Sequence, residues 1–214
     1  MDQDIEIINN QTRLEKLKHF LKNNLKLITI ILISIILVLI GFFSFQIYKT
    51  NKRNETAEKY NLSIAQFDKG SNPIAINSIE EIINIKDSTY SPLALYFLID
   101  NQIDLPKEKI NKYFDIIINE IKLDDEIKNL NILKKALYNS EIQNEEEMLK
   151  IVNPLINSAS IWKSHALYLM GEYYYSKNEK QKSIEFFKKI IETNNANPTI
   201  KLEAQKRITR DLSD

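Results

Sequence analysis

The chain has 214 residues, balances 29 basic against 29 acidic side chains, and contains no cysteine. A protein that binds duplex nucleic acid normally carries an excess of Lys and Arg to neutralise phosphates, and this chain carries none. The lack of cysteine excludes disulfides, a thiolate nucleophile and Cys-ligated zinc. With three Gly and five Pro, the chain also has too few turn-forming residues for a sheet of many tight turns.

The first predicted element in chain order is an apolar helix. No residue between Leu27 and Phe45 is charged, and roughly 19 residues at about 1.5 Å each span a hydrocarbon core. Three hydroxyl residues interrupt the run without forming a polar stripe. The run is too long and begins too far from the N-terminus for a cleavable signal, and no Ala-x-Ala follows it. We therefore predict an uncleaved transmembrane helix over residues 27–48.

Basic residues flank this helix on both sides. Five precede it, and four follow it: Arg13, Lys16, Lys18, Lys22 and Lys26, then Lys49, Lys52, Arg53 and Lys59. The positive-inside rule therefore favours a cytoplasmic tail over residues 1–26 by a margin of a single residue. Charge alone leaves two orientations open for the domain over residues 49–214.

Beyond Tyr48 the sequence predicts one helix after another. We expect first helices to begin near residues 55, 92, 125 and 161, and their partners near 73, 106, 144 and 180, which is the period of a helix-turn-helix solenoid. Four prolines occupy predicted first turns: Pro73, Pro92, Pro106 and Pro198. The predicted caps are Asn72, Ser91, Asn144 (with Glu147) and Asn197.

Side-chain spacing gives the same period. Four sets share an i, i+4, i+7 pattern: Ala75-Ile79-Ile82, Ile110-Phe114-Ile117, Met148-Val152-Leu155 and Ser183-Phe187-Ile190. We therefore predict an all-α fold, in which the transmembrane helix is followed by a tetratricopeptide-like α-solenoid of about four helical hairpins and a C-terminal capping helix.

The last hairpin resembles the tetratricopeptide repeat. The residues that match its consensus, in a structural role, are Leu167, Met170, Gly171, Tyr174, Ser183, Phe187 and Ile190. Small residues stand where paired helices approach closely, and large ones fill the space beside them. The hairpin departs from the consensus at Leu167, Met170 and Ser183, and Asn195 stands where a proline usually closes the repeat. Ala204, Ile208 and Leu212 are predicted to cover the end of the stack.

The whole layout resembles the YfgM-type ancillary subunit of the SecYEG translocon. The resemblance rests on "TRLEKLKHFLKNNLKLI" ahead of the span and on "AEKYNLSIAQFDKG" and "ALYLMGEYYYSKNEKQKSIEFFKKIIE" after it. It implies a single-pass protein of the bacterial inner membrane whose N-terminus is cytoplasmic and whose helical domain faces the periplasm. It also implies association with the translocon and with membrane-anchored periplasmic folding factors.

No motif predicts chemistry. HExxH, GxSxG, GxGxxG and the P-loop are absent, and no nucleophile–base pair is present. We predict no catalytic, cofactor or metal site, and we assign His19 to the membrane interface and His165 to packing or surface. The acidic clusters at residues 124–126 and 145–147 stand at helix starts, where carboxylates favour the macrodipole. Tyr173 and Tyr175 are predicted to point away from the position of Tyr174 in the repeat core. They are candidates to line a peptide-binding groove, and the alternative is a core or hairpin contact.

The sequence therefore predicts an interaction module and not an enzyme. In this hypothesis a membrane-tethered surface binds translocon subunits, periplasmic chaperones or emerging clients, and takes part in protein transport without a small-molecule substrate or nucleic acid. The alternative is a cytoplasm-facing, membrane-anchored adaptor of another membrane complex. Neither the client, the partner surface nor the oligomeric state follows from the sequence.

Overall fold

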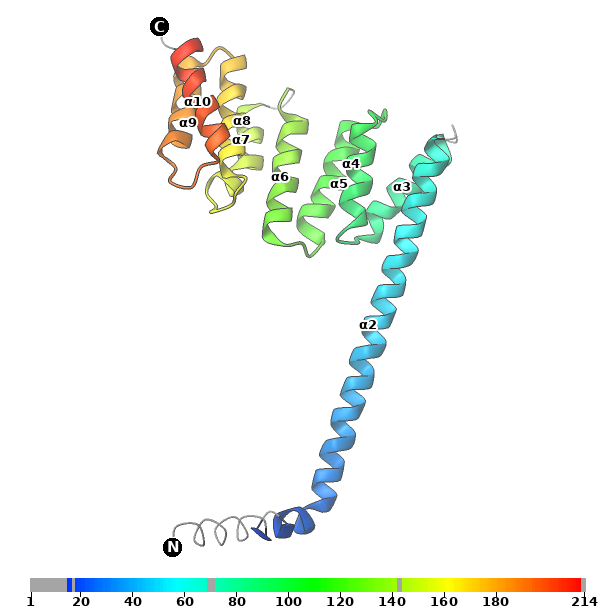
Figure 1. The fold of residues 1–214 in the computed structure, drawn as a ribbon. Coiled ribbons are helices and arrows are strands. Elements are labelled where there is room, and N and C mark those ends of the chain that lie inside the picture. The colour runs from blue at the N-terminus through cyan, green and yellow to red at the C-terminus, as the bar shows by residue number, and fades with distance from the viewer. Residues whose placement is uncertain (1–14, 17, 69–71, 142–143, 213–214) are drawn as a thin grey trace, which may run out of the picture. The chain divides into compact units, whose positions relative to one another are not determined.

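A computed structural model describes residues 15–16, 18–68, 72–141 and 144–212, and every regular element among them is a helix (Figure 1). The labelled helices are α2 (Leu25–Asp68), α3 (Asn72–Ile85), α4 (Tyr90–Asp100), α5 (Lys107–Glu120), α6 (Asp125–Asn139), α7 (Glu145–Ile156), α8 (Lys163–Ser176), α9 (Lys180–Glu192) and α10 (Pro198–Asp211). The predicted all-α fold is confirmed. The chain divides into two units, Met1–Glu55 and Thr56–Asp214.

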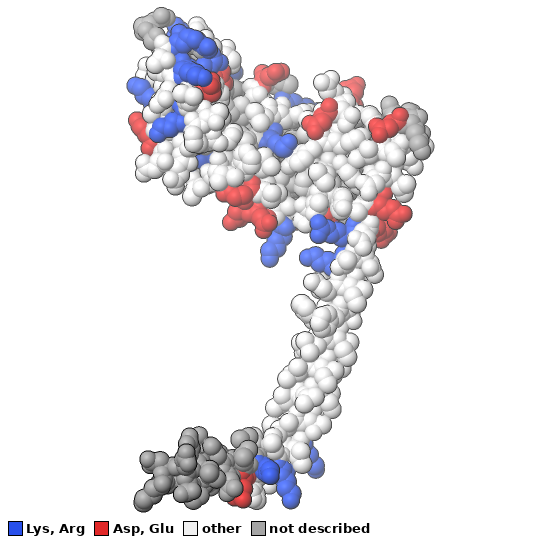
Figure 2. Space-filling model, viewed as in Figure 1, with Lys and Arg blue, Asp and Glu red and all other residues white. Residues whose placement is uncertain are grey.

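The first unit contains the apolar part of α2. This helix is long and apolar enough to cross a membrane, and none of its apolar stretch is buried in the protein. The stretch of α2 between Lys26 and Lys49 carries no charged residue, and Figure 2 shows it as white between basic residues at both ends. The Thr29 hydroxyl donates to the Leu25 carbonyl at 2.8 Å, and the Ser34 hydroxyl donates to the Ile30 carbonyl at 2.9 Å. Both hydroxyls are therefore satisfied within the helix, as a hydrocarbon environment demands.

The second unit consists of helical hairpins that follow one another in chain order. The second helices of the hairpins begin at Asn72, Lys107, Glu145 and Lys180, so successive starts are separated by 35, 38 and 35 residues. These starts lie within one residue of the predicted ones. The first helix of the first hairpin is the end of α2, and α10 follows the last hairpin. The predicted four hairpins and C-terminal helix are present.

Helix starts in the second unit use side-chain caps. The Asn144 side chain accepts from the Glu147 N–H at 2.9 Å, and Asn197 accepts from the N–H groups of Thr199 and Ile200, so both predicted caps are confirmed. The prediction that Ser91 caps α4 is wrong. The helix begins earlier, at Tyr90, because a carboxylate oxygen of Asp87 accepts from the N–H groups of Thr89 and Tyr90, both at 2.8 Å.

The Ser91 hydroxyl has a different use. Ser91 is fully buried, and its hydroxyl donates to the Ile82 carbonyl of α3 at 2.9 Å. The bond therefore joins α3 to α4 and does not close a helix end. The side chain of Asn72, the other predicted cap, lies outside the described residues.

The core of the second unit is a succession of three apolar clusters. The first joins α3, α4, α5 and α6 around residues such as Ile79, Leu95 and Phe114. The second lies among α6, α7 and α8, and the third joins α8, α9 and α10. Each cluster is contributed by neighbouring helices, which is how stacked repeats bury a continuous core without long-range contacts.

Candidate binding groove

A groove lies between α5 and α7, over α6, in the middle of the second unit. Its volume is about 500 Å³, and polar and aliphatic side chains alternate along its walls. The lining residues are Asn111, Asp115, Ile118, Asn119, Ile132, Lys135, Asn139, Glu147, Lys150, Ile151 and Pro154. We refer to this feature as the α5–α7 groove.

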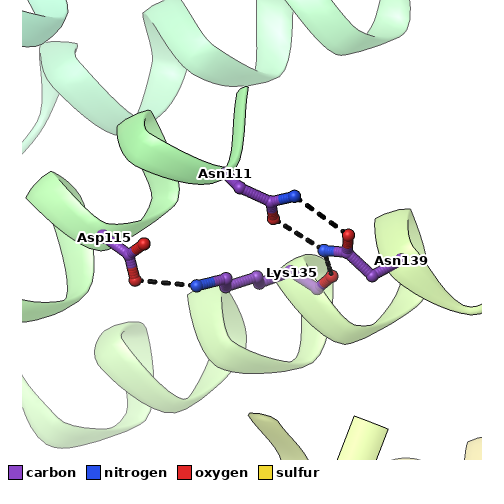
Figure 3. Close-up of polar contacts among 4 residues, drawn as sticks. All are labelled: Asn111, Asp115, Lys135 and Asn139. Atoms are coloured by element: carbon purple, nitrogen blue, oxygen red, sulfur yellow. Dashed lines mark hydrogen bonds and ion pairs between the residues drawn. The ribbon is translucent and has the colours of Figure 1, made fainter. Parts of the chain in front are cut away.

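Two asparagines form a reciprocal amide pair in this groove. Asn111 Nδ2 donates to Asn139 Oδ1 at 3.0 Å, and Asn139 Nδ2 donates to Asn111 Oδ1 at 2.7 Å (Figure 3). Asn139 Nδ2 also donates to the Lys135 carbonyl at 2.7 Å. Asn139 is fully buried, so these bonds replace the water that its amide loses on folding. The pair fixes the register of α5 against α6.

One turn further along α5, a charged pair joins the same two helices. Lys135 Nζ lies 2.7 Å from Asp115 Oδ1 (Figure 3). The Lys135 side chain is only 16% exposed, whereas that of Asp115 is 53% exposed. The ammonium is therefore held by the protein, and the carboxylate still faces water and can accept a further hydrogen bond from a ligand.

The α7 wall of the groove has a proline inside its helix. Pro154 has no N–H, so it cannot donate the hydrogen bond that the carbonyl of Lys150 would accept in a regular helix. Lys150 and Pro154 both line the groove, so the missing helical hydrogen bond lies in its α7 wall. Among the described residues, no ion pair engages the exposed side chains of Glu147 and Lys150.

Taken together, the walls offer hydrogen-bond donors and acceptors above an aliphatic floor. Ile118, Ile132 and Ile151 supply the apolar surface. The amide of Asn119, the second N–H of Asn111 and the Lys150 carbonyl are groups that an extended peptide backbone can pair with. These groups could hold an extended segment through hydrogen bonds and apolar contact.

The consensus-matching residues of the last hairpin all lie inside the protein, away from the α5–α7 groove. Gly171 is buried, and the other six are at most 2% exposed: Leu167, Met170, Tyr174, Ser183, Phe187 and Ile190. A Cβ built on Gly171 would lie 2.5 to 2.8 Å from three atoms of the Phe187 ring. The Ser183 hydroxyl donates to the Gly171 carbonyl at 2.8 Å. Side chains of α9 therefore contact the backbone of α8 directly.

The two candidate groove tyrosines have different surroundings. Tyr173 is 3% exposed and packs in the second core cluster. Tyr175 is half-buried, and the Arg207 guanidinium lies 4.8 Å from the centre of its ring. Neither residue lines the α5–α7 groove, and their role in partner binding stays a prediction.

One polar cluster links α7 to the last hairpin. A carboxylate oxygen of Glu145 accepts from the Tyr174 hydroxyl at 2.9 Å, and both of its oxygens lie 2.9 Å from Lys182 Nζ. The hydrogen bond from Lys182 holds the pKa of Glu145 below its ordinary value. Burial raises the pKa of Tyr174, and the hydrogen bond to Glu145 adds to this effect. The cluster is therefore charged yet self-contained, as expected of a structural contact.

The described residues contain no group of three or more metal-ligating side chains. His165 packs against the Trp162 ring with 5.3 Å between ring centres, and its Nδ1 atom is buried. The sequence did not single out Asn111, Asn139, Lys150 or Pro154. A proline inside an amphipathic pattern was the one available signal, because in an Asn-rich chain a single asparagine does not stand out.

The fold and groove define a helical-repeat protein with a ligand-sized opening between neighbouring repeats. The chain belongs to the tetratricopeptide repeat-like domain family, whose model matches residues 18–204. This match includes the apolar part of α2 as well as the hairpins. No curated protein and no solved structure matches the chain.

Proposed function

We propose that this protein is a membrane-tethered interaction module that binds an extended segment of a partner protein in the α5–α7 groove. The observation that carries the proposal is the family match over residues 18–204, because one model includes both the apolar helix and the repeats. Repeat domains of this kind are typically interaction scaffolds and not enzymes.

Binding in the groove is an equilibrium process without a chemical step. The partner's backbone N–H and C=O groups would pair with the Lys150 carbonyl and with the amides of Asn111 and Asn119. An aliphatic side chain of the partner would lie on Ile118, Ile132 and Ile151. Burial of such a side chain would supply affinity, and the paired amides would set the register.

In this proposal residues 1–26 form a cytoplasmic tail, residues 27–48 cross the inner membrane, and residues 49–214 form a periplasmic domain. The support is the excess of one basic residue before the span, together with the resemblance to the YfgM-type subunit. The tether would raise the effective concentration of the groove at the membrane, so that weak contacts suffice.

We further propose that the partners are subunits of the SecYEG translocon, membrane-anchored periplasmic folding factors or emerging client chains. The support is the order of basic tail, span and repeat domain, which is the layout of that family. In the same proposal the seven consensus-matching residues of the last hairpin form a regular repeat that holds the end of the domain rigid.

A second orientation remains, because five basic residues before the span against four after it is a small asymmetry. In that orientation the same domain would be a cytoplasmic adaptor of another membrane complex. A pair of C-terminal fusions distinguishes the two. The proposal predicts that the alkaline phosphatase fusion is active and that the fusion to green fluorescent protein does not fluoresce. An inactive phosphatase fusion beside a fluorescent one would establish the adaptor.

Partner identity needs a separate experiment. The full-length protein, purified in mild detergent from its own membranes, should retain translocon subunits. A variant with the groove filled, Asn119→Trp, should retain less of the same subunits, whereas a matched change at exposed Asn153, which does not line the groove, should not. Equal retention by both variants would contradict the role of the groove and leave the membrane assignment intact.

A further inference from the structure

The segment ahead of α2 is helical and amphipathic. Residues 18–23 are helical, and a turn at Asn24 separates them from α2 (Figure 1). Both the backbone N–H and the side-chain amide of Asn24 donate to the Phe20 carbonyl, at 3.0 and 2.9 Å. The end of this segment is therefore closed by its own hydrogen bonds before the apolar helix begins.

One side of this segment is apolar and exposed. Phe20 is 62% exposed, Leu21 is 45% exposed, and Leu25 at the start of α2 is 58% exposed. Phe20 and Leu21 are consecutive in the segment, and Leu25 follows just after the turn at Asn24. We refer to these three residues as the apolar row. Large apolar side chains are costly to leave in water, and no described residue covers them.

The other side of the segment is basic. Lys16, Lys18, Lys22 and Lys26 are exposed, and the only carboxylate nearby in the sequence is Glu15, since the next acidic residue is Glu55. Lys18 and Lys22 are one turn apart and share a face. The segment therefore presents a row of positive charges directly beside a row of apolar side chains.

We infer that residues 18–26 dock on an anionic phospholipid surface. The apolar row would enter the boundary between headgroups and acyl chains, and the lysines would lie among lipid phosphates. Charge complementarity and continuity with the apolar helix both favour lipid as the occupant. The inference rests on the proposed function only in taking α2 as membrane-spanning. It adds a second contact with the bilayer, one that depends on lipid composition.

The absence of cysteine makes a direct test simple. Single variants Phe20→Cys, Lys22→Cys and Ile36→Cys of the full-length protein would be spin-labelled in phosphatidylcholine vesicles with and without phosphatidylglycerol. Accessibility to oxygen reports the apolar phase, and accessibility to a water-soluble nickel chelate reports the aqueous phase.

With phosphatidylglycerol present, the label at Phe20 should be accessible to oxygen and protected from nickel, and the label at Lys22 should show the reverse. A label at Phe20 that meets nickel as freely as the label at Lys22 would overturn the inference. A label at Phe20 that is shielded from both reagents would also overturn it and would indicate a protein contact. A label at Ile36 that meets nickel would instead contradict the membrane span.

A charge variant supplies the second arm. Lys16→Gln, Lys18→Gln and Lys22→Gln together should retain about tenfold less phosphatidylglycerol after purification, because each lysine near an anionic surface contributes to binding. The matched control changes three exposed lysines of the second unit, Lys112, Lys122 and Lys188, to Gln. Equal lipid retention by the two triple variants would contradict the inference.

Discussion

The last hairpin and the α5–α7 groove belong to one repeat fold, but their helices meet in different ways. In the last hairpin, Gly171 brings the backbone of α8 against the ring of Phe187, and Ser183 bonds directly to that backbone. In the groove, long polar side chains of α5 and α6 meet above an opening of about 500 Å³. The first arrangement excludes ligands, and the second leaves room for one.

Under the proposed function, this difference assigns stability and binding to separate repeats. The consensus residues mark the place where helices pack most closely, because small residues are required there. None of them lines the groove, whose walls carry longer polar side chains. The following variants test that division, from the largest expected effect on stability to the smallest. The fluorescence of Trp162, the single tryptophan, reports unfolding of the full-length protein in detergent.

Phe187→Ala should be the most damaging change. The ring is fully buried among Leu167, Ile190 and Ala204, and removal of such a ring costs about 3–5 kcal/mol of unfolding free energy. Urea unfolding would measure the loss. A loss below about 1 kcal/mol would show that the last hairpin does not carry the stability assigned to it.

Gly171→Ala should cost about 1–3 kcal/mol through overpacking, because its Cβ would lie 2.5 Å from the nearest ring atom of Phe187. This cost exceeds the gain of up to about 1 kcal/mol from replacing a helical glycine. Gly41→Ala is the matched control, since nothing lies within 4 Å of its Cβ. Adding Phe187→Leu should recover part of the loss, and no recovery would argue against the close contact.

Asn111→Ala should cost about 1–2 kcal/mol, because it removes both hydrogen bonds of the amide pair and leaves the buried Asn139 amide with its bond to the Lys135 carbonyl. Asn139→Leu should cost much less unfolding free energy in the Asn111→Ala background than in the parent protein, because no amide is then left to need a partner. A double-mutant cycle in urea measures this coupling. Strictly additive losses would show that the amide pair does not hold the groove together.

Gln102→Gly should stabilise the domain by about 0.5–1 kcal/mol. Gln102 follows α4 with φ of 51°, a conformation that glycine adopts without strain. Asn178 holds the equivalent place after α8 with φ of 61°, and asparagine tolerates it, so Asn178→Gly should gain less. Equal gains in stability from Gln102→Gly and Asn178→Gly would show that the two positions do not differ in backbone strain. Asn101→Gly, with φ of −88° at the parent residue, controls for flexibility.

These outcomes also bear on how far the sequence predicts the molecule. Proline and asparagine signals placed the starts of α3, α5 and α7 within one residue, because backbone geometry and capping are local. The start of α9 followed from the repeat period instead. The start of α4 was missed, since the acceptor is Asp87 and Ser91 bonds across to α3. A serine can cap a helix or donate to the backbone of a neighbouring helix, and which of the two it does depends on the residues packed around it.

The groove was beyond sequence reasoning for a different reason. Asn111 and Asn139 are 28 residues apart, and their contact depends on the rotation of α5 against α6. A shift of one residue in either helix would separate the two amides. Helical periodicity predicts which side of each helix is buried, but it does not predict which polar side chains meet across two helices.

The smallest expected effect on stability concerns the contact between Glu145 of α7 and the last hairpin. Hydrogen bonds from Lys182 and Tyr174 lower the pKa of Glu145 below 4.5. Its stabilising effect is therefore complete above about that pH and is lost as the pH falls through the lowered value. Glu145→Gln should flatten the acid side of the stability profile. Because the Glu145 and Lys182 side chains are 41% and 44% exposed, high salt should weaken the effect. Identical acid profiles would contradict this contact.

The central claim is that the α5–α7 groove is the partner-binding surface, and site-specific photo-crosslinking in native membranes tests it most directly. A photoreactive residue at Lys150, which lines the groove, should yield a defined adduct with a partner protein, and Asn119→Trp should abolish that adduct. The same photoreactive residue at Asn153, exposed on α7 but outside the groove, should yield little. Adducts of equal yield at Lys150 and Asn153, unchanged when the groove is filled, would contradict the account.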